Sequence, residues 1–115
     1  MAVLLVCALA GCRPSKPMTL CKRAEAAGVL KDCWEFEGNR GRATNMVVAN
    51  DVKVGRVFIA AYASRAAYED DLRDKEVAHP GCLHGNPKKG TLVFADRGAS
   101  EDICRAVYDI VDADE

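Results

Sequence analysis

The chain has 115 residues, of which 50% are hydrophobic and 29% are charged, and its formal net charge is −1. This length suits one domain with one core and is too short for two. The composition is that of a globular protein and argues against disorder. Charges of both signs are interspersed, and Arg40-Gly41-Arg42 and Lys88-Lys89 are too short to form a basic surface, so we interpret both as solvated turns. We therefore expect no nucleic-acid partner.

The chain begins with an apolar run, Ala2–Ala10, and the tetrapeptide Leu9-Ala10-Gly11-Cys12 closes it. This tetrapeptide resembles a lipobox, the signal at which bacterial lipoproteins are cleaved before a cysteine that then carries lipid. The resemblance implies a signal peptide over residues 1–11 and a lipid on Cys12, although the run lacks an initial Lys or Arg. The run is far shorter than the roughly 20 residues of a membrane-spanning helix. By the same resemblance, Arg13 permits transfer to an outer membrane where one exists, and we expect the domain there, facing the periplasm or the cell surface.

The segment after the lipobox predicts a tether and then a folded domain. Pro14 and Pro17 enclose polar residues, so residues 12–18 predict an extended tether without core residues. Residues 19–115 then form a single globular domain. Thr19 is a plausible N-cap for a short amphipathic helix that stops at Gly28.

Beyond Gly28 the hydrophobic period changes from helical to alternating. Strands are predicted around Trp34 and Phe36 and over residues 45–50, 57–63 and 91–96. Helices are predicted over residues 65–73, after the N-cap Ser64, and beyond the N-cap Ser100. The 57–63 run is apolar throughout, which favours a central strand that is covered on both faces.

The predicted order is therefore α-β-β-β-α-β-α. The simplest fold that buries these faces is an α+β two-layer sandwich with three helices and a small mixed sheet. The strand–helix–strand succession over residues 57–96 predicts a parallel pair with a right-handed crossover. The order of segments over residues 54–112, with Gly85-Asn86-Pro87-Lys88 before the last strand, loosely resembles small bacterial lipoproteins and implies no catalytic residue.

Four cysteines remain after the signal and the lipid site: Cys21, Cys33, Cys82 and Cys104. In an exported domain an even number predicts disulfides, whereas in the cytosol it would suggest metal or redox chemistry. On one unbroken helix Cys21 and Cys33 would lie about 18 Å apart, so their pairing requires the chain to reverse at Gly28. We predict Cys21–Cys33 and Cys82–Cys104, the second restraining a Pro- and Gly-rich loop over residues 74–90.

The 74–90 loop also holds His79, Cys82 and His84, the one cluster with ligand-like residues, and Cys104 could supply a fourth ligand. Imidazole and thiolate suit zinc or copper. The spacing matches no zinc-finger or zincin pattern, so we favour solvent-exposed histidines and expect no metal and no cofactor. A metal-binding or redox module on these residues is the competing hypothesis.

Other catalytic patterns are missing from the sequence. It contains no Cys-x-x-Cys, no Gly-x-Ser-x-Gly elbow and no phosphate-binding loop. Glu69-Asp70-Asp71 is interpreted as a charged helix surface, because catalytic acids must converge in a cleft. Trp34 and Phe36 are interpreted as core residues, with a partner-binding patch as the alternative.

These observations favour a lipid-anchored cell-envelope domain that is not an enzyme. We expect it to bind another protein or an envelope component, and the sequence does not identify that partner. Two other hypotheses stay open at this point: the metal-binding or redox module, and a soluble cytosolic domain whose residues 1–11 are an apolar first strand or helix.

Overall fold

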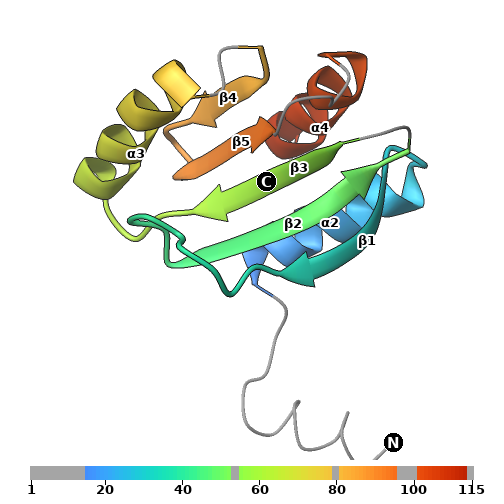
Figure 1. The fold of residues 1–115 in the computed structure, drawn as a ribbon, viewed down its shortest axis with the longest axis horizontal. Helices are drawn as coiled ribbons and strands as arrows, with labels where there is room; N and C mark the ends of the chain where they lie inside the picture. The colour runs from blue at the N-terminus through green and yellow to red at the C-terminus, as the bar shows by residue number, and fades with distance from the viewer. Residues whose placement is uncertain (1–14, 53–54, 79–80, 96–100, 114–115) are drawn as a thin grey trace, which may run out of the picture.

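The computed structural model describes residues 15–52, 55–78, 81–95 and 101–113. These residues form three helices and five strands, arranged as an α+β fold (Figure 1). In chain order the elements are α2 (Lys16–Ala26), β1 (Leu30–Glu35), β2 (Asn45–Asp51), β3 (Arg56–Ala61), α3 (Arg65–Ala78), β4 (Leu83–Asn86), β5 (Thr91–Ala95) and α4 (Glu101–Ala113). The predicted order is confirmed, with β4 as one additional strand.

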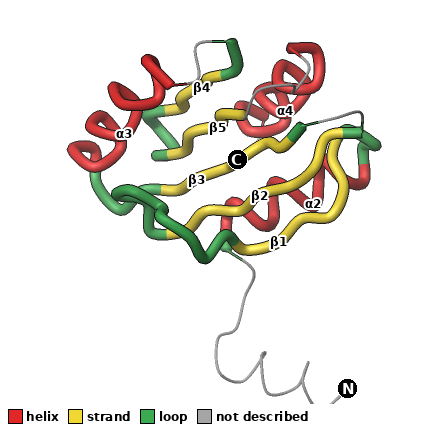
Figure 2. Tube along the Cα trace, in the orientation of Figure 1, coloured by secondary structure: helices red, strands yellow, loops and turns green. Residues whose placement is uncertain are grey.

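The five strands make one sheet in the order β1-β2-β3-β5-β4 (Figure 2). All neighbouring strands are antiparallel. The central position of β3 confirms the prediction made from its continuous apolar run, and Val57 and Ile59 on it are fully buried. The edge strands β1 and β4 are those with the fewest buried residues.

The predicted parallel pair over residues 57–96 is wrong, because β3 and β5 are antiparallel. The reason is β4, which the sequence did not reveal as a strand. The chain leaves β3, passes through α3 and enters β4, which runs in the same direction as β3; β5 then turns back and pairs between them. The parallel relation therefore exists between β3 and β4, which are not neighbours.

The two faces of the sheet carry separate apolar clusters. The face beneath α2 and α4, here called the helix face, is built from small and aliphatic side chains such as Val47, Ile59, Val93, Leu20 and Val107. The opposite face, here called the aromatic face, contains Met46, Phe58, Phe94 and the partly buried Phe36, and α3 adds Tyr68. Helix α3 contacts β5 and β4, so it covers the aromatic face only on that side.

Helix α2 begins earlier than predicted. Its N-cap is Ser15, whose Oγ accepts a hydrogen bond from the Met18 backbone N–H at 3.3 Å, so the predicted cap at Thr19 is wrong. Pro17, taken as part of the tether, lies in the first turn, where a helix tolerates proline because that N–H has no intrahelical partner. The helix stops where predicted, with Gly28 at φ +76°.

The segment over residues 74–90 is also more ordered than predicted. Helix α3 extends to Ala78, and β4 and a tight turn fill the rest of the described part, with the Lys89 N–H donating to the Asn86 carbonyl at 3.2 Å. His79 lies outside the described residues. Instead of a long loop, this segment forms the sheet edge and the wall of a pocket.

Candidate functional site

A solvent-open pocket of about 300 Å³ lies between the start of α3 and the β4–β5 turn. Its lining comes from two stretches of the chain: Tyr62, Ala63, Ser64, Arg65, Tyr68, Pro87, Lys88, Lys89 and Gly90. The Tyr62 N–H donates to the Gly90 carbonyl at 2.9 Å, which holds the two stretches together. The volume is at the lower end for small-molecule sites, so it suits one small group.

The charged side chains of the pocket are all cationic. Arg65, Lys88 and Lys89 line it, and the lining residues include neither a carboxylate nor an imidazole. Arg65 Nε also lies 3.6 Å from Glu69 Oε1, but both side chains are more than half exposed, so this ion pair is weak. An anionic group is the ligand that such a lining favours.

The hydroxyl of Ser64, in the pocket lining, caps helix α3. Its Oγ accepts a hydrogen bond from the Ala67 N–H at 3.1 Å, which confirms the predicted N-cap of α3. The residues that line the pocket supply this hydroxyl with neither a carboxylate nor an imidazole. The arrangement can therefore bind a ligand but lacks an activated nucleophile.

Two tyrosines form the inner wall of the pocket. Tyr68 is buried, and its ring meets that of Tyr62 edge-on, with centroids 6.0 Å apart. Burial raises the pKa of both phenols. For Tyr62 the Asp71 carboxylate raises the pKa further, although it does not complete a hydrogen bond of ordinary geometry with the buried hydroxyl. Both tyrosines thus stay neutral at physiological pH.

Asp71 corrects a prediction about the acidic run at residues 69–71. It was expected on the helix surface, yet it is only 4% exposed. Its Oδ2 accepts a hydrogen bond from the Arg42 N–H at 3.0 Å, and Arg42 Nε lies 3.3 Å from Asp70 Oδ2. Asp71 therefore fastens the loop between β1 and β2 to α3.

His84, one of the predicted loop histidines, lies in a cluster that joins β4 to α4. Its Nε2 lies 2.9 Å from both carboxylate oxygens of Asp112, and its ring stacks on Tyr108 with centroids 4.7 Å apart. Asn86 Nδ2 donates to Asp112 Oδ1 at 3.0 Å. Burial opposes ionisation of Asp112, but the hydrogen bonds from His84 and Asn86 outweigh it and lower the pKa of this carboxyl.

The described residues of the competing metal-site hypothesis, Cys82, His84 and Cys104, are not assembled as metal ligands. Cys82 and Cys104 are joined to each other as a disulfide, so neither is a thiolate ligand, and His84 faces Asp112. Within the described ranges, no group of three or more His, Cys, Asp or Glu side chains could hold a metal ion.

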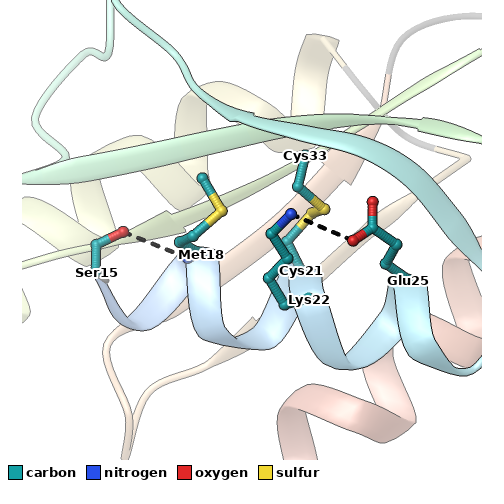
Figure 3. Close-up of a disulfide and its surroundings, with 6 residues drawn as sticks. All are labelled: Ser15, Met18, Cys21, Lys22, Glu25 and Cys33. Carbon is teal, nitrogen blue, oxygen red and sulfur yellow. Dashed lines mark hydrogen bonds and ion pairs between the residues drawn. A yellow bond between two sulfur atoms is a disulfide. The ribbon is translucent and has the colours of Figure 1, made fainter. Parts of the chain in front are cut away.

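Both predicted disulfides are present. Cys21 of α2 and Cys33 of β1 are bonded with their Cα atoms 6.2 Å apart, and Figure 3 shows the strand crossing the helix at this bond. Cys82, just before β4, is bonded to Cys104 of α4 across 6.0 Å. Each bond thus fastens one helix of the helix face to one edge of the sheet. Cys12 lies outside the described residues.

The two aromatic residues predicted as core differ in exposure. Phe36 packs edge-on against Phe58 with centroids 5.7 Å apart. Trp34, in contrast, is 41% exposed, so its assignment to the core is wrong. It pairs with Val48 across the β1–β2 ladder, which places it on the aromatic face at the sheet edge that α3 does not cover.

Sequence reasoning did not find the pocket, because its two halves are about one helix and one strand apart in the chain. Lys88-Lys89 was treated as a solvated turn, and only the tertiary approach of this turn to α3 makes it part of a site. Comparison with protein-family models, curated proteins and solved structures found no match to this chain. Along the described parts of the chain, no helix has both the length and the apolar character needed to cross a bilayer.

Proposed function

We propose that this chain is an exported domain, held on an envelope membrane by lipid on Cys12, that binds an envelope component without catalysing a reaction. The observation that carries the proposal is the cysteine pairing. Cys21–Cys33 and Cys82–Cys104 use every cysteine after the lipobox, so Cys12 has no intramolecular partner among them.

This pairing supports export because structural disulfides persist in oxidising compartments and are rare in the cytosol. It thereby favours the signal-peptide interpretation of residues 1–11 over a soluble cytosolic domain. Arg13, by resemblance to lipoprotein sorting, permits transfer to an outer membrane where one exists, so that the domain would face the periplasm or the cell surface.

The pocket supports binding and suggests the kind of ligand. Arg65, Lys88 and Lys89 suit an acidic group of an envelope component, such as a phosphate or a carboxylate. The lining offers no general base, and Ser64 is held as a helix cap. Recognition of an anionic group is therefore what these residues do best.

The anchor is tested by Cys12→Ser, with Cys7→Ser as the matched control inside the signal. We expect Cys12→Ser to move the protein from the membrane fraction to the soluble envelope fraction, because several acyl chains at roughly 0.8 kcal/mol per buried methylene are lost together. Cys7→Ser should leave the protein in the membrane. Serine-variant protein that still sediments with membranes refutes the anchor.

The pocket is tested by Lys88→Glu in the mature domain, with inorganic phosphate as the probe in an NMR titration. Lys22→Glu is the matched control, because it makes the same charge change on α2, where Lys22 pairs with Glu25 at 3.3 Å. We expect phosphate to shift the resonances of residues around Arg65 and Lys89 in the wild type and the control only. Equal shifts in all three proteins contradict an anion site here.

A further inference from the structure

The first described residue after the proposed anchor, Ser15, and the one tryptophan of the chain lie at the same edge of the sheet. Ser15, which caps α2, donates from its Oγ to Glu35 Oε1 at 2.8 Å on the helix face. Trp34, the preceding residue of β1, has its side chain on the aromatic face, so the two meet only along the β1 edge. Figure 1 shows α2 beginning close to the end of β1. Trp34 is 41% exposed, so its ring is available at this edge.

The tether allows little distance between this edge and a lipid on Cys12. Ser15 follows Cys12 by three residues, and three extended residues span at most about 10 Å. A domain on so short a tether cannot turn freely above a bilayer, so some part of its surface near Ser15 must stay close to the headgroups.

The start of α2 and β1 are also held in a fixed relation. The disulfide Cys21–Cys33 joins the middle of α2 to β1, one residue before Trp34 (Figure 3). The Ser15–Glu35 hydrogen bond adds a second link between the same two elements. Because both links join α2 to β1, the start of α2 and the backbone of Trp34 keep a fixed relation.

Tryptophan is the side chain best suited to the membrane interface, because its ring is apolar and its indole N–H remains near water. We propose that the β1 edge lies on the phospholipid surface with Trp34 in the headgroup region, an inference that rests on the proposed lipid at Cys12. The lipid supplies the attachment and Trp34 sets the orientation. The pocket lies on the β3–β5–β4 side of the sheet, so this orientation turns it away from the membrane.

The charges at this edge predict how the contact depends on lipid type. Lys31 of β1 is exposed, and so are the carboxylates of Asp32 and Glu35. Since both signs are present, the edge has no strong preference for anionic lipid. Contact should therefore be the same on neutral and on anionic bilayers and should not weaken with salt.

Because Trp34 is the only tryptophan, its fluorescence reports the contact directly. Lipidated full-length mature protein would be reconstituted into phosphatidylcholine vesicles with brominated or unbrominated acyl chains. We expect Trp34 emission to be blue-shifted on the vesicles and strongly quenched by the brominated lipid. The quenching should be equal when one third of the lipid is phosphatidylglycerol.

The matched control moves the tryptophan to the far side of the domain. Trp34→Phe combined with Val77→Trp places the reporter on α3, at a position that is 86% exposed. We expect this reporter to keep its emission on brominated vesicles. Quenching of both reporters, of neither, or of the α3 reporter alone overturns the proposed orientation.

The anchor and the orientation fail in distinguishable ways. Protein that floats with the vesicles but shows no quenching of Trp34 retains its anchor and refutes only the orientation, leaving Trp34 free for a protein partner. Protein whose Cys12 carries no acyl mass, and which does not float, refutes the proposed function and the orientation together.

Discussion

The helix face and the aromatic face of the sheet are held together by different means. On the helix face, side chains such as Val47, Ile59 and Val93 are fully buried beneath two helices, and each helix is disulfide-bonded near an edge of the sheet. On the aromatic face, Phe58 and Phe94 stack with ring centroids 5.1 Å apart. Among the described residues, α3 is held to this face by packing and polar contacts and not by a disulfide.

Two long cationic side chains, one of them on α3, lie over rings of the aromatic face. Lys75 Nζ lies 4.9 Å from the centre of the Phe94 ring, and Arg56 lies 5.9 Å from that of Phe58. Such contacts contribute about 0.5–1 kcal/mol where exposed. The comparison shows that a small domain can place its covalent restraints on one layer and leave the other layer available for a pocket.

Removal of the disulfides should have the largest effect. Replacing Cys82 and Cys104 by Ala opens a bond across 22 residues, and replacing Cys21 and Cys33 opens one across 12, each costing about 3 kcal/mol by the chain-entropy relation. Together they approach the total of about 5–15 kcal/mol for a typical domain, so the fourfold variant should be largely unfolded. Urea titration monitored by circular dichroism checks this, and unchanged midpoints would contradict it.

Replacing a leucine by alanine should lower the free energy of unfolding more on the helix face than in α3. Leu20 of α2 is 1% exposed and lies in the helix-face cluster, whereas Leu72 of α3 is only partly buried against the aromatic face. We expect Leu20→Ala to cost about 3 kcal/mol and Leu72→Ala about 1 kcal/mol. Equal losses in urea unfolding would show that the two layers are equally well packed.

Glycine substitutions should separate backbone strain from crowding. Gly41 has φ +60°, and a Cβ there would lie 2.7 Å from Asp71 Oδ2, so Gly41→Ala should cost about 2 kcal/mol. Gly28 has φ +76° with nothing within 4 Å, so Gly28→Ala should cost about 1 kcal/mol through strain alone. Gly81→Ala, which meets neither restriction, is the neutral control. A larger loss at Gly28 than at Gly41 would contradict the close contact with Asp71.

The His84–Asp112 pair should have a small, pH-dependent effect. The folded state lowers the pKa of Asp112, so its carboxylate contributes stability near neutral pH that is lost as the pH falls through this lowered pKa. Because the two side chains are 31% and 46% exposed, we expect Asp112→Asn to cost only about 0.5 kcal/mol near neutral pH. At low pH the wild type and Asp112→Asn should have the same free energy of unfolding. A difference between them that grows as the pH falls would contradict the role given to the Asp112 carboxylate.

Much of the fold could be predicted because local signals agreed with the tertiary structure. Gly28 predicted both the end of α2 and the reversal that lets Cys33 reach Cys21. The continuous apolar run of β3 predicted its central position. Prediction failed at Pro17, which was taken as part of a tether although proline fits the first turn of a helix.

The other failures concern segments whose structure depends on distant neighbours. β4 has four residues and includes Gly85, so it has little strand signal of its own and forms by pairing with β5. Asp71 is one of three consecutive acids, and only the Arg42 N–H distinguishes it from its neighbours. The pocket and the exposed Trp34 likewise arise from tertiary contacts that no local pattern encodes.

The central claim is that this is an exported domain with lipid on Cys12, and the intact mass of the protein extracted from envelope membranes tests it most directly. Measured without reduction, the mass should correspond to residues 12–115 plus acyl groups, reduced by two hydrogens for each of the two disulfides. Fragmentation should place the acyl groups on Cys12. A chain that retains residues 1–11 and carries no lipid would contradict the account.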